Sequence, residues 1–274
     1  MTKKRFWRMV TLGIRQFRDP YYQGFAAQLS FYFLMSIVPI VILLSQVLLN
    51  VFHLSIDQAV DWILEYTKGP LHDEMRRLLA YKTGKLGSVI YIFITLWAAS
   101  GAQFSMMRIT NFMFTEGRST GKGYFRERFR AILNMLIFLI IIVLAMVALV
   151  FGGQILDFAG VDPRVWEIIR WPVALILYFM IISYNYYIMP SDKLKFRQII
   201  PGSIFAAIGM VAVTMVYSYY AMHADYSVIY GVLGNLVAIM LWFYILAWVL
   251  CLGVLFNKVW MDTSANGSHQ DGFL

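Results

Sequence analysis

Six long stretches of the sequence carry no Asp, Glu, Lys or Arg, and this spacing of charge constrains the fold more than any other feature. The uncharged stretches cover residues 20–56, 86–107, 131–156, 171–191, 198–224 and 226–257. An α-helix rises 1.5 Å per residue, so about 20 apolar residues cross the hydrocarbon core of a bilayer. The pattern predicts six transmembrane helices. A soluble six-helix core is disfavoured because only 14% of the residues are charged, against about 25% in soluble domains.

Helices account for these stretches better than barrel strands do. The segment from Leu133 to Gly153 is apolar on every side and lacks the alternation of a transmembrane strand. Inside lipid every backbone amide needs a protein partner, and a helix supplies one within its own segment. The single cysteine, Cys251, falls in the last stretch, which excludes an intrachain disulfide and a cysteine metal site. The predicted fold class is an all-α polytopic membrane protein with six transmembrane helices.

The positive charges predict the orientation. If the N-terminus is cytoplasmic, 16 of the 23 Lys and Arg residues fall in the inner segments and seven in the outer ones. Basic loops stay on the cytoplasmic side, so both termini are expected inside. The net charge of +8 would also suit a nucleic-acid partner, but these basic residues flank the spans and form no single groove-sized face. We therefore expect no nucleic-acid partner.

Three segments are predicted along the chain. Residues 1–19 form a cytoplasmic amphipathic helix on the membrane surface, with a frayed basic tail as the alternative. Residues 20–260 form the six-helix transmembrane domain, with an outer insertion at about 55–85 whose two apolar stripes indicate an amphipathic helical hairpin. Residues 261–274 are polar and rich in small side chains, which predicts a disordered cytoplasmic tail.

The groups that most enzymes need are missing from the apolar segments. The fifteen acids lie outside the apolar centres, and the four histidines form no pair at metal-ligand spacing. No phosphate-cradling glycine loop and no nucleophile elbow occurs in the sequence. We therefore expect no enzymatic activity, no cofactor and no metal site. The lack of an ionisable group at depth also argues against proton pumping.

Neutral polar residues are the candidates for a cavity or substrate path. In lipid, each of them also serves as a simple hydrogen bond between helices, worth about 0.6 kcal/mol on average, and this alternative stays open. The candidates, with the helix-kinking proline and two glycines, are Gln28, Ser30, Pro39, Gln103, Asn111, Asn134, Tyr226, Tyr230, Gly231, Gly234, Asn235 and Asn257.

The stretch YSVIYGVLGNL, residues 226–236, stands at the outer end of the last uncharged segment. Its glycines allow either a helix break or a close helix contact, and non-helical backbone at depth requires protein or water beside it. One hypothesis is an outer mouth lined by Tyr226, Tyr230 and Asn235. A glycine packing site capped by interfacial tyrosines is the alternative.

Basic residues between the second and third spans are candidates for contact with anionic head groups. Each basic residue near an anionic surface contributes about 1 kcal/mol of attraction. These candidates are Arg108, Arg126, Arg128 and Arg130. The expected partners are membrane lipids, especially anionic ones, and a homo-oligomer is left open.

Several stretches resemble the YihY/BrkB family of bacterial inner-membrane proteins. They are GFAAQLSFYFLMSIVPIVILL, LWAASGAQFSMMRITNFMF with YFRERFRA, YIMPSDKLKFRQIIPGSIFAA, and the last span from YSVIYGVLGNL to GVLFN. The resemblance covers roughly residues 10–260. Where the family often ends its last span with Gly-Ala-Glu-Leu-Asn, this chain has Leu255 in place of the acid and keeps Asn257.

The resemblance implies a multi-pass protein of the bacterial cytoplasmic membrane. The family was long labelled ribonuclease BN, and its members are linked to serum resistance and suspected of moving envelope lipids. No residue here resembles a metal-binding nuclease site, so we expect no ribonuclease activity. Two hypotheses remain: a transporter or flippase of an amphipathic, anionic envelope lipid or similar solute, and a membrane scaffold or lipid-binding protein that transports nothing.

Overall fold

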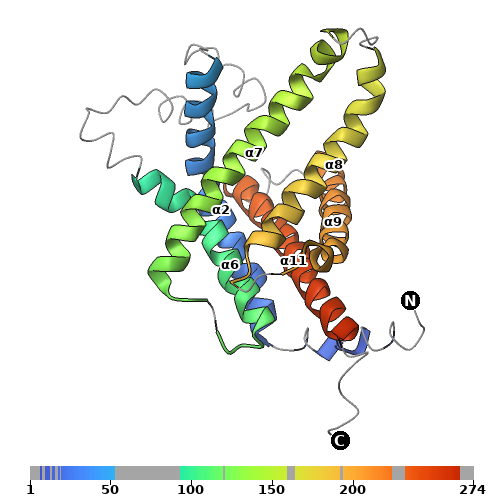
Figure 1. Ribbon diagram of the computed structural model, residues 1–274. Coiled ribbons are helices and arrows are strands. Elements are labelled where there is room, and N and C mark those ends of the chain that lie inside the picture. Colours follow the sequence, from blue (N-terminus) through green and yellow to red (C-terminus); the bar gives the residue numbers. More distant parts are fainter. Residues whose placement is uncertain are drawn as a thin grey trace, which may run out of the picture.

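A computed structural model describes most of the helical core. It covers residues 7, 10–12, 14–15, 18, 20–52, 93–119, 121–158, 164–191, 194–223 and 232–265. All regular structure within these ranges is helical. Figure 1 shows the main helices, which are α2 (Pro20–Phe52), α6 (Gly101–Phe114), α7 (Tyr124–Phe158), α8 (Arg164–Ile188), α9 (Phe196–His223) and α11 (Val232–Ala265).

Four of these helices are long and apolar enough to cross a membrane. The crossing segments are Tyr124–Leu149, Ile168–Ile188, Phe196–Tyr220 and Val237–Thr263, and α2 contains the shorter apolar stretch Gly24–Ile40. This confirms the prediction of an all-helical polytopic membrane protein. The count of six spans stays a prediction, because the second uncharged stretch begins among residues 53–92, outside the described part of the chain.

The outward faces of the helices are apolar. Leu144 on α7, Ile208 on α9 and Met215 on α9 have 62%, 67% and 68% of their side chains exposed. A water-soluble monomer rarely exposes an apolar surface on this scale. Hydrocarbon is the solvent that such a surface fits, in agreement with the membrane assignment.

Helices α9 and α11 approach each other closely because glycines face glycines. Among the described helices, α11 packs most extensively against α9 and α2. At the α9 contact, the Gly202 N–H donates to Asn257 Oδ1 at 2.6 Å, and a Cβ at Gly202 would overlap the Gly253 carbonyl oxygen. The Tyr186 hydroxyl of α8 reaches the same place and donates to the Leu250 carbonyl at 2.8 Å. Small residues at such contacts let the helix backbones pack without lipid between them.

The last helix extends further than the sequence indicated. The segment 261–274 was predicted to be disordered, yet α11 continues to Ala265. The Thr263 hydroxyl donates to the Val259 carbonyl at 2.8 Å, and Lys258 lies 3.9 Å from Asp262 one turn on. These local contacts support one more helical turn past the predicted boundary of the domain.

Other predicted segments fall partly or wholly outside the described residues. Of residues 1–19, positions 7, 10–12 and 14–15 are helical, and Trp7 and Ile14 are exposed. The amphipathic surface helix stays a prediction there. The outer hairpin at about 55–85 and residues 266–274 lie beyond the part of the chain that the structure describes.

The glycine contact gives a first prediction. Gly202→Ala should lower the free energy of unfolding by about 1–3 kcal/mol, because the added methyl group forces α9 away from α11. Unfolding in mixed detergent micelles measures the change. Gly24→Ala is the matched control, since a Cβ at Gly24 meets no atom within 4 Å. Equal effects of the two substitutions would contradict the account of the packing.

Candidate functional site

The helix that leads into α6 is interrupted. Residues 93–99 are helical, Ser100 forms a turn, and α6 starts at Gly101. The Ser36 hydroxyl of α2 occupies the interruption: it donates to the Ala98 carbonyl at 3.1 Å and accepts from the Ala102 N–H at 3.3 Å. These two backbone groups are four residues apart and would otherwise pair with each other. A side chain inserted into the backbone ladder is a recognised cause of a helix kink.

Arg128, near the start of α7, packs against this interruption. Its Nη2 atom donates to the Trp97 carbonyl, which also accepts from the Ser100 hydroxyl at 3.0 Å. Its guanidinium carbon lies 4.3 Å from the centre of the Trp97 ring and 5.1 Å from that of Phe104. Only 5% of the residue is exposed. The sequence names Arg128 as a candidate contact for an anionic head group, and this stays a prediction; the packing of α6 against α7 covers most of the residue.

The charge of Arg128 is incompletely compensated. No described acid forms an ion pair with it, and its Nε atom is buried without a hydrogen-bond partner among the described residues. The two aromatic rings offset part of the desolvation, since a desolvated cation–π contact contributes about 2 kcal/mol. Buried cations in membrane segments are costly and mark substrate or ion sites. Arg128 is therefore the strongest candidate for binding an anion.

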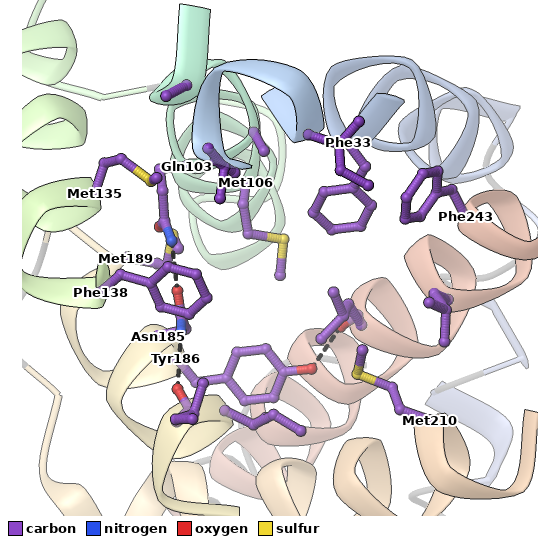
Figure 2. Close-up of a pocket in the computed structure, with 18 of the residues that line it drawn as sticks. Phe33, Gln103, Met106, Met135, Phe138, Asn185, Tyr186, Met189, Met210 and Phe243 are labelled. Atoms are coloured by element: carbon purple, nitrogen blue, oxygen red, sulfur yellow. Dashed lines mark hydrogen bonds between the residues drawn. The ribbon is translucent and has the colours of Figure 1, made fainter. Parts of the chain in front are cut away.

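A cavity of about 310 Å³ lies at the centre of the helices. Each of the six main helices contributes to its wall, as Figure 2 shows for many of the residues. The lining is almost entirely apolar. It includes Phe33 of α2, Met106 of α6, Phe138 of α7, Tyr186 of α8, Met210 of α9 and Phe243 of α11.

Two amides provide the polar groups of the cavity wall. Gln103 Nε2 donates to Asn185 Oδ1 at 3.0 Å, and Asn185 Nδ2 donates to the Ile181 carbonyl at 2.8 Å (Figure 2). The Gln103 Oε1 atom is buried and accepts no hydrogen bond from any described residue. The pair joins α6 to α8 and leaves one unused acceptor. Gln103 is the predicted path residue that the structure places in this cavity.

An ion pair between a buried acid and a partly exposed arginine holds the cytoplasmic ends of α6, α7 and α8 together, given the predicted orientation. Glu127 is 2% exposed and lies 3.0 Å from Arg130. The Ser191 hydroxyl donates to Glu127 Oε1 at 3.0 Å, and the Ser191 N–H donates to Asn111 Oδ1 at 2.7 Å. Arg130 Nη2 also donates to the Ile188 carbonyl at 3.0 Å, which satisfies an end carbonyl of α8. We call Asn111, Glu127, Arg130 and Ser191 the inner cluster. Arg130 bonds other residues of the protein there, and its candidate role as a head-group contact stays a prediction.

A second ion pair connects α11 to the loop after α6. Lys258 is buried, and its Nζ lies 3.0 Å from Glu116 Oε1. The hydrogen bond from Lys258 lowers the pKa of the exposed Glu116 carboxyl below its usual value. The contact therefore favours the charged form of Glu116 and fastens the loop to the last helix.

The remaining predicted residues divide into packing contacts and surface positions. Asn257 bonds Gly202 as described, the Ser30 hydroxyl donates to the Met240 carbonyl at 3.3 Å, and Asn134 Nδ2 contacts Met107 Sδ at 3.6 Å. These bonds join helices, which is the alternative that the sequence had left open. Gln28 is exposed, Pro39 is half-buried within α2, and Arg108 and Arg126 are exposed.

The predicted outer mouth lies mostly beyond the described residues. Tyr226, Tyr230 and Gly231 fall outside them, and Gly234 and Asn235 belong to the first turn of α11. The structure therefore does not test the mouth.

The profile of the family described as Virulence factor BrkB matches residues 14–272. The chain belongs to the BrkB family. It is also 30% identical over 243 residues to the ribonuclease-like protein YfkH of Bacillus subtilis (strain 168), covering 84% of this chain and 87% of that protein. No solved structure matches the chain. This BrkB protein is thus a membrane protein with apolar helices.

The contacts of several site residues were not predicted. Ser36 and Asn185 stand in apolar stretches, where sequence alone does not distinguish an inserted hydroxyl or a paired amide from an ordinary packing contact. Glu127 carried a usable signal: Glu127 and Arg130 are three residues apart at the start of an apolar helix, which is ion-pair spacing.

The inner cluster gives a second prediction. Arg130→Met should lower the free energy of unfolding by about 1–3 kcal/mol, less than for a fully buried pair because Arg130 is partly exposed. The loss arises because Glu127 stays buried without its main partner. Unfolding by SDS in mixed micelles measures it.

A double variant and a neighbouring arginine control this experiment. Glu127→Gln combined with Arg130→Met should recover part of the stability, since no buried charge is then left alone. Arg126→Met removes the same charge from an exposed position of α7 and should change stability by about 0.5 kcal/mol or less. If Arg126→Met were as costly as Arg130→Met, the ion pair would not explain the loss.

Proposed function

We propose that this BrkB protein moves an anionic, amphipathic lipid across the bacterial cytoplasmic membrane, without enzymatic activity. The observation that carries the proposal is Arg128, a buried cation at an interrupted membrane helix with no described acidic partner. A lipid phosphate supplies the missing charge and accepts from the guanidinium nitrogens that the protein leaves unused.

The surroundings of Arg128 suit a ligand that arrives from the bilayer. Tyr124 is 53% exposed and Trp97 is 36% exposed, so the aromatic residues beside the guanidinium border the lipid. The exposed Arg108 and Arg126 add positive charge near the same end of α7. An anionic head group is attracted by these exposed charges before it reaches the buried one.

The interrupted helix favours transport over simple binding. Membrane transporters hold their substrates beside broken helices, where backbone groups are free to change partners. Here the Trp97 and Ala98 carbonyls take hydrogen bonds from the Arg128 and Ser36 side chains. These two carbonyls thus bond side chains instead of backbone N–H groups, while the Ser100 and Phe104 N–H groups on either side keep their helical bonds.

The transport proposal predicts the effect of removing Arg128. Vesicles containing the protein and a fluorescent phosphatidylglycerol should exchange that lipid between leaflets faster than protein-free vesicles. Arg128→Met should reduce the rate to that of protein-free vesicles, because the head group loses its buried cation. Protection of the inner-leaflet label from dithionite measures the rate. Arg126→Met, which removes an exposed charge two residues away, should keep most of the activity.

The outcomes separate the two functional hypotheses. No acceleration by the intact protein, tested with anionic and zwitterionic lipids, would contradict transport. If phosphatidylglycerol still bound the protein in an Arg128-dependent way, the scaffold or lipid-binding hypothesis would replace it. If the Arg128→Met variant still accelerated lipid exchange between the leaflets, Arg128 would have no role in transport.

The name of the Bacillus subtilis relative raises ribonuclease activity as a competing function. The described residues contain no group of three or more His, Cys, Asp or Glu side chains placed to hold a metal ion. Glu127, a buried acid, is bonded to Arg130 and Ser191 inside the inner cluster. The proposal that the protein does not cleave RNA is tested directly with purified protein.

Purified protein incubated with labelled RNA and magnesium or manganese should therefore leave the RNA intact. Cleavage that copurifies with the protein and is lost in both Glu116→Gln and Glu127→Gln would contradict this prediction. Gel electrophoresis of the RNA measures the outcome.

A further inference from the structure

A groove of about 410 Å³ runs between α8 and α9. Leu175 and Phe179 of α8 line one side of it, and Ala207, Ile208 and Met215 of α9 line the other. Both helices include segments that are long and apolar enough to cross the membrane. The groove therefore faces lipid, and its natural occupant is a hydrocarbon chain rather than water.

Tyr178 separates this groove from the central cavity. The residue belongs to the lining of both spaces. On α9, Met210 borders the cavity while its neighbours Ala207 and Val211 border the groove. The two spaces are thus adjacent across α8 and α9, with one half-buried aromatic side chain in the wall they share.

The chemistry of the cavity matches that of the groove. Gln103 and Asn185 bond each other, so the cavity offers little to a charged head group. Apolar cavities stay dry and bind apolar ligands, and one of about 150 Å³ already holds benzene. Four methionines, Met106, Met135, Met189 and Met210, contribute to the wall. Their flexible side chains adapt to a ligand of variable shape.

We infer that a lipid hydrocarbon chain enters between α8 and α9, passes Tyr178 and is bound in the central cavity. The occupant is an acyl chain of a membrane lipid. This site is separate from Arg128, because Ala102 and Met106 lie on the cavity face of α6 while Phe104, which contacts Arg128, lies on the opposite face. The inference therefore does not depend on the proposed transport of an anionic head group.

Photolabelling tests the inference directly. The protein is reconstituted in phosphatidylcholine vesicles containing a phosphatidylcholine with a diazirine in its acyl chain, irradiated, digested and mapped by mass spectrometry. Adducts are expected at Met106, Met135 or Met210 inside the cavity, in addition to those on outward-facing residues such as Leu144. Labelling confined to outward-facing residues would overturn the inference.

Two variants test the route. Ala207→Trp fills the groove and should reduce the cavity adducts several-fold, with the outward adducts retained as the sign of an intact protein. Tyr178→Ala opens the shared wall and should raise the cavity adducts several-fold, which keeps the test decisive if the tryptophan variant fails to fold. Leu144→Trp is the matched control on the lipid-facing side of α7 and should change nothing. Unchanged cavity labelling in Tyr178→Ala would overturn the route.

The Arg128→Met variant separates this inference from the proposed function. It should abolish lipid exchange yet leave the cavity adducts at the level of the intact protein. If the intact protein is labelled in the cavity but exchanges no lipid, the acyl-chain site is supported and the transport proposal is contradicted. If it exchanges lipid but is not labelled in the cavity, the transport proposal is supported and the acyl-chain site is contradicted.

Discussion

In the hydrocarbon of a bilayer a buried polar atom finds its partner in the protein or has none, and the packing of this BrkB protein follows from that constraint. Ser30, Tyr186 and Asn257 each bond a backbone group on another helix. The Asn111 amide accepts from the Ser191 backbone after α8. Each bond specifies a helix neighbour where apolar contacts alone would allow sliding, since lipid tails are as apolar as leucine.

Arg128 Nε and Gln103 Oε1 depart from this rule, because both are buried without described partners; polar atoms of Ser105, Thr110, Ser183, Tyr184 and Trp242 do the same. Gln103 belongs to α6, and Arg128 packs against α6 at Phe104, the next residue. Ala102 connects the two places, because it lines the cavity and donates its N–H to Ser36 at the interruption. One residue of α6 thus contributes both to the cavity wall and to the Ser36 contact.

The sequence predicted the helices well and the role of individual charges less well. Uncharged stretches locate membrane helices because a charge in lipid is costly. The uncharged stretch 131–156 lies wholly within α7 (Tyr124–Phe158), as predicted. The helix begins earlier, however, at Tyr124, and brings Glu127, Arg128 and Arg130 into its first turns. A span predicted from the absence of charge starts after the last charged residue, Arg130, and so leaves all three in the preceding loop. Their true environment comes from Trp97, Phe104 and Ser191, which lie more than twenty residues away, so neither spacing nor composition reveals it. Gln103 stands out as a lone amide in an apolar stretch, but the sequence does not reveal that Asn185 is its partner, because 82 residues separate the two.

The strong contacts among the described helices fall into two groups. The inner cluster binds α6, α7 and α8 into one group, and the contact of Gly202 with Gly253 and Asn257 binds α9 to α11. Between these two groups runs the seam of α8 and α9, where the groove and Tyr178 lie. Tyr186 crosses from α8 to the Leu250 carbonyl with one hydrogen bond near the cavity. Two further contacts tie α11 to the other group: Lys258 pairs with Glu116 in the loop after α6, and the Ser30 hydroxyl of α2 bonds the Met240 carbonyl. Tyr178 of α8 and Met210 of α9 both line the cavity beside the seam, so the cavity wall there is formed by side chains rather than by an interhelical bond.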